Sequence, residues 1–144
     1  MLFRSKTLVT VVEFVLYRDL CEALGQEELN VDRFHKIVEE MKRWPMERDK
    51  PDISYVAGQK IDCLMAKFAV HPENIDLMQT VEVILINLNP LKLKLDLWKA
   101  QNIYFAAGKK LYTEKKKLAQ EDGQAQIWLS SFENLGKILQ VKIQ

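Results

Sequence analysis

Large apolar side chains recur at seven-residue intervals in two neighbouring columns along residues 95–118. The first column is Leu97, Tyr104, Leu111 and Leu118, and the second is Trp98, Phe105 and Tyr112. This spacing predicts an amphipathic helix of about two dozen residues with a wide apolar stripe, and Ala100 and Ala107 near the stripe would let a neighbouring backbone approach. We therefore expect Trp98 and Phe105 to be core residues, together with Trp128 of the next apolar segment. The polar positions of the same helix should face solvent: Asn102, Lys109, Lys110 and Lys116.

Two polar residues of this segment have expected backbone partners. Gln101 lies at the edge of the stripe, so its amide should be partly buried and bonded to backbone, for example in the connector 89–94. An unpaired buried amide would cost on the order of 1–3 kcal/mol. Asp96 precedes the helix and should act as its N-cap by accepting hydrogen bonds from backbone amides.

The helical period recurs in five further segments, which predicts helices over residues 5–24, 31–41, 52–68, 71–88 and 125–139. Gly25 should end the first helix, and Asn30 and Asp52 should cap the second and third. Pro45 should end the second helix, and Pro72 suits the first helical position of the fourth.

Three features qualify this helical pattern. β-Branched residues early in the first segment leave a strand as its alternative interpretation. Gly58 inside the third helix is expected to mark a close helix contact, since glycine costs about 1 kcal/mol there relative to alanine. Asn89 and Pro90 break the fourth helix, and the alternating residues 91–95 predict an extended connector or one short edge strand. The fold class is all-α, an irregular bundle of about six helices with short connections, with residues 1–144 forming a single α-helical domain.

Composition and charge place the chain among ordinary globular domains. Of its 144 residues 48% are apolar and 28% charged, and the net charge of +1 creates no global attraction to nucleic acid or to an anionic membrane. Cys21 and Cys63 are too few for a disulfide framework or zinc site and are expected to be reduced, buried thiols. Glu13 interrupts the apolar run 7–17, which is neither a signal peptide nor long enough to span a bilayer. We expect a cytoplasmic protein without membrane contact.

No arrangement of residues indicates catalysis. Asp32-x-x-His35 is half of the paired motif that a di-iron bundle needs, so we expect it to be coincidental, and Glu39 should instead form a surface pair with His35. The adjacent acids Glu27–Glu28 and Glu39–Glu40 point in different directions on a helix and make no acid/base dyad. We assign no catalytic, cofactor-binding or metal-binding residue, and expect no cofactor.

Lysines gather at the end of the long helix, at Lys109–Lys110 and Lys115–Lys117, close to Tyr104 and Tyr112. Basic residues interleaved with aromatics can hold single-stranded nucleic acid. Here the tyrosines belong to the apolar stripe, acids follow the lysines, and cations are favoured at a helix C-terminus in any case. A solvated helix end is the preferred interpretation, and nucleic acid is not the expected partner.

Three stretches resemble a known family: LDLWKAQNIYF at 95–105, QAQIWLSSF at 124–132 and LGKIL at 135–139. They are similar to the end of an uncharacterised helical domain that lies C-terminal to the catalytic domain in some bacterial family-57 glycoside hydrolases, relatives of α-amylases and α-mannosidases. The resemblance covers about the last fifty residues. The residues that match its motifs are Trp98, Gln101, Asn102, Tyr104, Trp128, Phe132, Leu135 and Gly136.

The resemblance implies an accessory domain and not an enzyme. The family's catalytic carboxylates belong to its barrel, and a barrel needs about 250 residues, so no catalytic residue carries over to this chain. The expected function is that of a non-catalytic helical domain that packs against the catalytic domain of a glycoside hydrolase. The alternative is a stand-alone helical adaptor that binds another protein, and a nucleic-acid-binding helical domain is a weaker third hypothesis.

Overall fold

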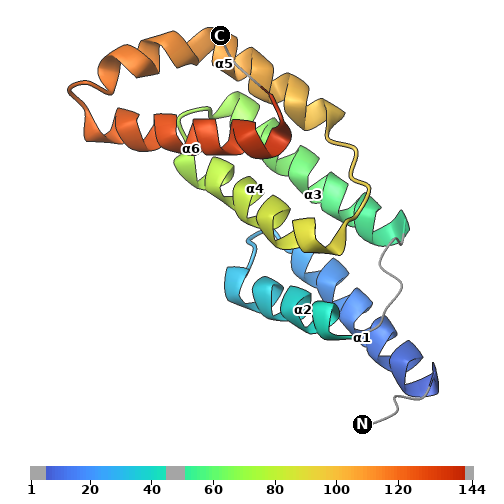
Figure 1. The fold of residues 1–144 in the computed structure, drawn as a ribbon. Helices are drawn as coiled ribbons and strands as arrows, with labels where there is room; N and C mark the ends of the chain where they lie inside the picture. The colour runs from blue at the N-terminus through green and yellow to red at the C-terminus, as the bar shows by residue number, and fades with distance from the viewer. Residues whose placement is uncertain (1–5, 45–50, 142–144) are drawn as a thin grey trace. The chain divides into compact units, whose positions relative to one another are not determined.

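The computed structural model describes residues 6–44 and 51–141, except for the side chains of residues 6, 51 and 52. These residues form six α-helices and one short 3-10 helix, with no strand among them (Figure 1). The elements are α1 Lys6–Gly25, α2 Val31–Arg43, α3 Pro51–Val70, α4 Ile75–Leu88, η1 Asn89–Leu91, α5 Trp98–Leu118 and α6 Gly123–Leu139. The predicted all-α bundle of about six helices is confirmed. None of the described helices combines the length and the apolar content needed to cross a membrane.

The chain divides into two compact units. The first contains Met1–Lys60 and Asn87–Leu95, and the second contains Ile61–Ile86 and Asp96–Gln144. The boundaries fall inside α3 and near the end of α4, so each of these helices contributes one part to each unit.

The first unit is built on the packing of α1 against α2. The Asn30 side chain caps α2 by accepting a hydrogen bond from the Arg33 amide at 3.1 Å, as predicted. Gly25 ends α1, and Lys60 Nζ donates to the carbonyl oxygens of Gln26 at 2.6 Å and Glu27 at 3.1 Å just beyond it. The buried residues of the two helices are Leu16, Leu20, Ala23, Leu24, Phe34, Ile37, Val38 and Met41.

The first half of α1 departs from the expected pattern. Leu8 and Val15 follow the helical period but are exposed. α1 has 20 residues whereas α2 has 13, so α2 does not accompany α1 along its whole length. Periodicity identified the helix correctly, but it could not show how much of the helix has a partner.

The second unit centres on the antiparallel pair α5 and α6, joined by a short turn (Figure 1). The parts of α3 and α4 in this unit supply further apolar residues. Buried side chains from these helices include Ile61, Leu64, Met65, Phe68, Met78, Val81, Ile84, Tyr104, Ala125, Trp128, Phe132, Leu135 and Leu139. The prediction that Trp128 is a core residue is confirmed, since its exposed fraction is 1%.

The starts of α3 and α4 differ from the prediction, and α6 begins two residues before the predicted start at residue 125. Pro72 is not the first residue of α4: residues 71–74 form a turn in which the Asn74 amide donates to the His71 carbonyl at 3.0 Å, and the helix begins at Ile75. α3 begins at Pro51, one residue before the expected cap Asp52, whose side chain lies outside the described residues.

The segment between α4 and α5 is a connector. η1 ends at Lys92, which adopts a left-handed conformation with φ 54°, and residues 93–97 have no regular structure. Asp96 Oδ1 accepts a hydrogen bond from the Trp98 amide at 3.1 Å, as expected of a residue that satisfies the first turn, although Leu97 occupies the cap position itself. The prediction of an extended connector or a short edge strand over residues 91–95 is wrong at its start, because Leu91 belongs to η1 and Lys92 is left-handed, and residues 93–95 form no strand.

Two expectations about small residues are wrong. A Cβ atom on Gly58 would meet nothing within 4 Å, so this glycine does not mark a close helix contact. The cysteines are free, but neither is buried as predicted: Cys63 is exposed and Cys21 is half-buried. Neither residue lies on the buried side of its helix.

Candidate functional site

Trp98 and Phe105 are on the surface, which contradicts the expectation that both belong to the core. Trp98 is 71% exposed and Phe105 44% exposed. The buried residues of α5 are Ala100, Tyr104 and Gly108, spaced four apart, so small residues let the helix approach its neighbours along that line. Trp98 and Phe105, in the second apolar column, face outward, whereas Tyr112 of the same column is half-buried and its ring lies 6.1 Å from that of Phe132.

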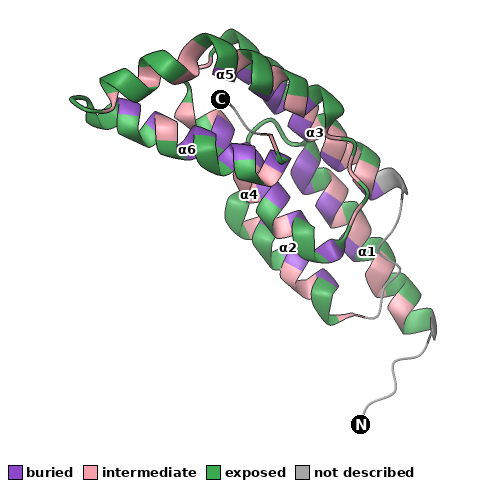
Figure 2. Cartoon of the chain, turned by 45° about the horizontal axis from the view of Figure 1, so that its top comes forward, coloured by how far each residue is buried: buried purple, intermediate pink, exposed green. Residues whose placement is uncertain are grey.

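A single face of α5 carries these exposed aromatic residues. Trp98, Asn102, Phe105, Lys109 and Lys116 are separated by four, three, four and seven residues, which places them on one side of the helix. All five are exposed, and we call them the outer face of α5. Figure 2 shows that much of α5 is exposed, in green. With a rise of 1.5 Å per residue, the Trp98 and Phe105 positions lie about 10 Å apart along the helix axis.

The outer face combines aromatic rings with positive charge. Lys109 Nζ lies 5.3 Å from the centre of the Phe105 ring, and Lys116 Nζ lies 5.6 Å from that of the half-buried Tyr112. Lys99, Lys110 and Lys117 are also exposed, about 100–120° round the helix from Trp98. The one acid in α5 is Glu114, about 160° round the helix from Trp98. The lysines therefore give this part of a nearly neutral chain a local positive charge.

Stacked aromatic rings fix α5 in its orientation. The Trp128 and Phe132 rings stack with centroids 4.8 Å apart, and the Phe132 and Tyr104 rings stack at 4.1 Å. The Tyr104 hydroxyl donates a hydrogen bond to the Phe132 carbonyl oxygen at 2.8 Å. Burial, with smaller contributions from Tyr112 and Glu133, raises the pKa of Tyr104 well above its ordinary value, so the hydroxyl keeps its proton and remains a donor.

A second tie joins α5 to the end of α6. Gln101 is half-buried, and its Nε2 donates to the Leu139 carbonyl oxygen at 2.8 Å. The expected backbone hydrogen bond is present, but its acceptor is the last turn of α6 and not the connector 89–94. Carbonyl groups in a last helical turn lack intrahelical donors, so a side-chain amide is a suitable partner there.

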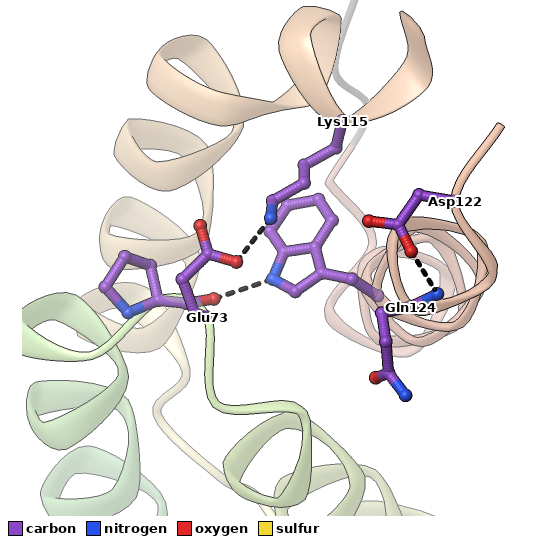
Figure 3. A network of polar contacts seen from close by, with 6 residues as sticks. Glu73, Lys115, Asp122 and Gln124 are labelled. Carbon is purple, nitrogen blue, oxygen red and sulfur yellow. Dashed lines mark hydrogen bonds and ion pairs between the residues drawn. The ribbon is translucent and has the colours of Figure 1, made fainter. Parts of the chain in front are cut away.

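Lys115 belongs to a different environment from the lysines around it (Figure 3). Its ammonium pairs with the Glu73 carboxylate and lies 5.6 Å from the centre of the Trp128 ring, and its side chain is 13% exposed. Trp128 Nε1 in turn donates to the Pro72 carbonyl oxygen at 2.6 Å. Nearby, Asp122 caps α6 by accepting from the Gln124 amide at 2.9 Å. Lys115 is therefore part of the packing between α5, α6 and the turn before α4. The prediction that all five lysines are solvated is wrong for Lys115.

The acids and histidine considered from the sequence do not assemble a reaction centre in residues 6–44 and 51–141. His35 Nδ1 lies 2.7 Å from Asn87 Oδ1, and Glu39 pairs with Lys42 at 2.6 Å instead of with His35. The hydrogen bond from Lys42 is the main reason that the pKa of Glu39 is lowered. Asp32, Glu27 and Glu28 are exposed. No three His, Cys, Asp or Glu residues of this part of the chain are placed to hold a metal ion.

The outer face of α5 presents groups that bind other molecules. Its indole and phenyl rings offer apolar area, its amide offers hydrogen bonds, and its ammonium groups offer charge. The apolar pattern of residues 95–118 predicted that Trp98 and Phe105 lie in the core, so this surface was not predicted from the sequence. Comparisons of the chain with protein-family models, with curated proteins and with solved structures found no match.

Proposed function

We propose that the chain is a non-catalytic helical domain that docks onto a partner protein through the outer face of α5. The observation that carries the proposal is the exposure of Trp98, 71% of which is open to solvent at the start of the helix. Tryptophan is among the residues that contribute most to binding when a partner covers it. Phe105, two turns further on, extends the same apolar surface.

The resemblance to family-57 glycoside hydrolases suggests the catalytic domain of such an enzyme as the partner. In the matching motif, Gln101 and Tyr104 face α6, whereas Trp98 and Asn102 are exposed. The inward pair has a structural role in this chain. A binding role explains the outward pair, because an accessory domain acts by packing against its catalytic neighbour. In this proposal the chain works in the bacterial cytoplasm and needs no cofactor.

A non-catalytic role is in keeping with the positions of the acidic residues. Glycoside hydrolysis requires two carboxyl groups about 5–10 Å apart on either side of the scissile bond, one with a raised pKa. Glu39 and Glu73 pair with lysines, and Asp96 and Asp122 bind backbone amides at helix starts. Each of these acids is therefore engaged in an ion pair or in a hydrogen bond at a helix start.

The runner-up is a stand-alone helical adaptor that uses the same surface on another protein. The outer face of α5 would serve either function, and the identity of the bound protein separates them. Nucleic acid is less well supported, because Lys115 is engaged by Glu73 and Tyr104 is stacked in the core.

The test is complex formation with the catalytic domain of a family-57 glycoside hydrolase from the same organism. Wild-type chain, Trp98→Ala and the control Ile127→Ala are each mixed with that domain and analysed by size-exclusion chromatography with light scattering. Ile127 is also an exposed apolar residue, but it lies on α6. We expect a complex with the wild type and the control, and at least a tenfold weaker one with Trp98→Ala.

Three results would count against this proposal. Absence of a complex with every variant would leave the adaptor as the better hypothesis. Equal binding by Trp98→Ala and wild type would show that the outer face of α5 is not the docking surface. The same preparations are assayed on α-linked glucans, and turnover by the isolated chain would contradict a non-catalytic role.

A further inference from the structure

We infer that the outer face of α5 is received by an apolar groove whose rim is acidic, on the surface of the partner protein. The inference rests on the proposed function and adds the chemistry of the partner. It is drawn from the spacing of the aromatic residues and from the charges around them.

The spacing on α5 matches the way in which a helix inserts into a groove. Trp98, Asn102 and Phe105 stand at positions i, i+4 and i+7, the pattern of anchor residues when an amphipathic helix lies in a hydrophobic groove. A single helix presents a convex surface, so a concave apolar partner covers more of the two rings than a flat one. Trp98 and Phe105, about 10 Å apart along the axis, require two adjacent apolar pockets.

The charges on α5 specify the rim of that groove. Lys109 and Lys116 are exposed on the outer face itself, and Lys99, Lys110 and Lys117 are exposed about 100–120° further round the helix. The chain as a whole carries only +1, so this positive charge is a local property of the surface and not a consequence of composition. Lys109 lies against the Phe105 ring, so a group that covers the ring also meets the ammonium. Apolar centres surrounded by complementary charge are the usual arrangement of protein interfaces.

A single strand of nucleic acid fits the same charges less well. Such strands stack successive bases on a series of open aromatic rings. On α5 the Lys109 ammonium lies over the Phe105 ring, and the Tyr112 hydroxyl donates to Glu133 at 3.0 Å, which brings an acid beside the next ring. Trp98 alone is more than half exposed among the aromatic residues of this helix.

The experiment places the photo-crosslinking amino acid p-benzoylphenylalanine at Asn102, between the two rings. The control carries it at Glu114, which is exposed on another side of the same helix. Both chains are irradiated in an extract of the organism that encodes them, and the crosslinked peptides are identified by mass spectrometry. The Asn102 reaction is repeated with Lys99→Gln, Lys109→Gln and Lys116→Gln combined, and with salt raised from about 50 mM to about 500 mM, where surface charges are screened. A melting curve confirms that the combined variant is folded.

We expect a protein adduct from position 102 and not from position 114. Its yield should fall at least fivefold both in the lysine variant and at high salt, and the crosslinked peptide should contain acidic residues next to apolar ones. A protein adduct that is insensitive to salt and to the lysines would overturn the acidic rim and leave the proposed function standing. An adduct removed by nuclease, an adduct between two copies of the chain, or no adduct specific to position 102 would overturn both.

Discussion

Tyr104 on α5 lies directly against Gly136 on α6. A Cβ atom added to Gly136 would come within 2.8 Å of the Tyr104 Cζ atom and within 3.2 Å of the Val141 carbonyl oxygen. The missing side chain at Gly136 leaves room for the Tyr104 ring to stack on Phe132 and for its hydroxyl to reach the Phe132 carbonyl oxygen. This fit sets the rotation of α5 about its own axis, and the rotation turns Trp98 and Phe105 outward.

Replacing Gly136 by alanine should therefore destabilise the protein. We expect a loss of about 1–3 kcal/mol in the free energy of unfolding, because the new methyl group forces Tyr104 or the backbone to move. The matched control is Gly58→Ala, where a Cβ meets nothing within 4 Å and the higher helix propensity of alanine should add up to about 1 kcal/mol. Urea unfolding measures both, and changes of the same sign would contradict the close fit at Gly136.

Tyr104→Phe should lower stability by about 0.5–1.5 kcal/mol through loss of the hydrogen bond to Phe132. The pKa of Tyr104 is raised in the folded state from an ordinary value of 10.0, mainly by burial, so the folded state binds the proton more tightly. The contribution of this proton to the free energy of unfolding is fully present below about pH 10. It decreases as the pH rises above that value, because the unfolded state releases the proton first.

The pH dependence of the free energy of unfolding tests the burial of Tyr104. The free energy of unfolding of the wild type should fall more steeply above about pH 10 than that of Tyr104→Phe. Tyr112 also has a raised pKa, chiefly because it donates a hydrogen bond to Glu133, but it is common to both proteins and cancels in the comparison. Parallel alkaline profiles would show that Tyr104 is not buried as described.

Two tryptophans of the second unit should respond to alanine substitution in opposite ways. Trp128→Ala removes a buried ring that stacks on Phe132, and we expect a loss of about 3–5 kcal/mol. Trp98→Ala should change the free energy of unfolding by no more than about 0.5 kcal/mol, because the side chain is exposed. A large loss in the free energy of unfolding of Trp98→Ala would show that Trp98 is a core residue. It would contradict the outer face of α5 as an exposed surface.

The Lys115–Glu73 pair should contribute measurably to stability, unlike the exposed lysines. We expect Lys115→Gln to cost about 1 kcal/mol, since the ammonium both pairs with Glu73 and lies near the Trp128 ring. The control Lys116→Gln alters an exposed residue and should cost less than about 0.5 kcal/mol. A double-mutant cycle with Glu73→Gln isolates the coupling, and a coupling of zero would contradict the pairing.

The sequence predicted the helices well because apolar residues repeat with the helical period in every segment. It identified the Asn30 cap, the end of α1 at Gly25 and the connector before α5. These features depend on residues close together in the chain. The start of α4 was misplaced because proline suits a turn as well as a first helical position, and the turn at His71 prevailed.

The orientation of α5 could not be predicted from the same pattern. Two columns of large apolar residues lie side by side on this helix, so the pattern predicted that both are buried. The buried line follows Ala100, Tyr104 and Gly108 instead, because Gly136 on α6 admits the Tyr104 ring. Lys115 is a similar case, since its partner Glu73 lies 42 residues away in sequence. Contacts between distant segments decide these positions, and a local pattern contains no information about them.

The most direct test of the outer face of α5 as a docking surface is ¹⁹F NMR of the chain labelled with 5-fluorotryptophan. Its three tryptophans, Trp44, Trp98 and Trp128, give separate signals, and single substitutions assign them. The free chain should show a solvent isotope shift between H₂O and D₂O at Trp98 and none at Trp128. On addition of the partner identified by crosslinking, or of the family-57 catalytic domain, Trp98 should lose that shift while Trp128 is unchanged. A complex in which Trp98 keeps its full isotope shift would contradict the account.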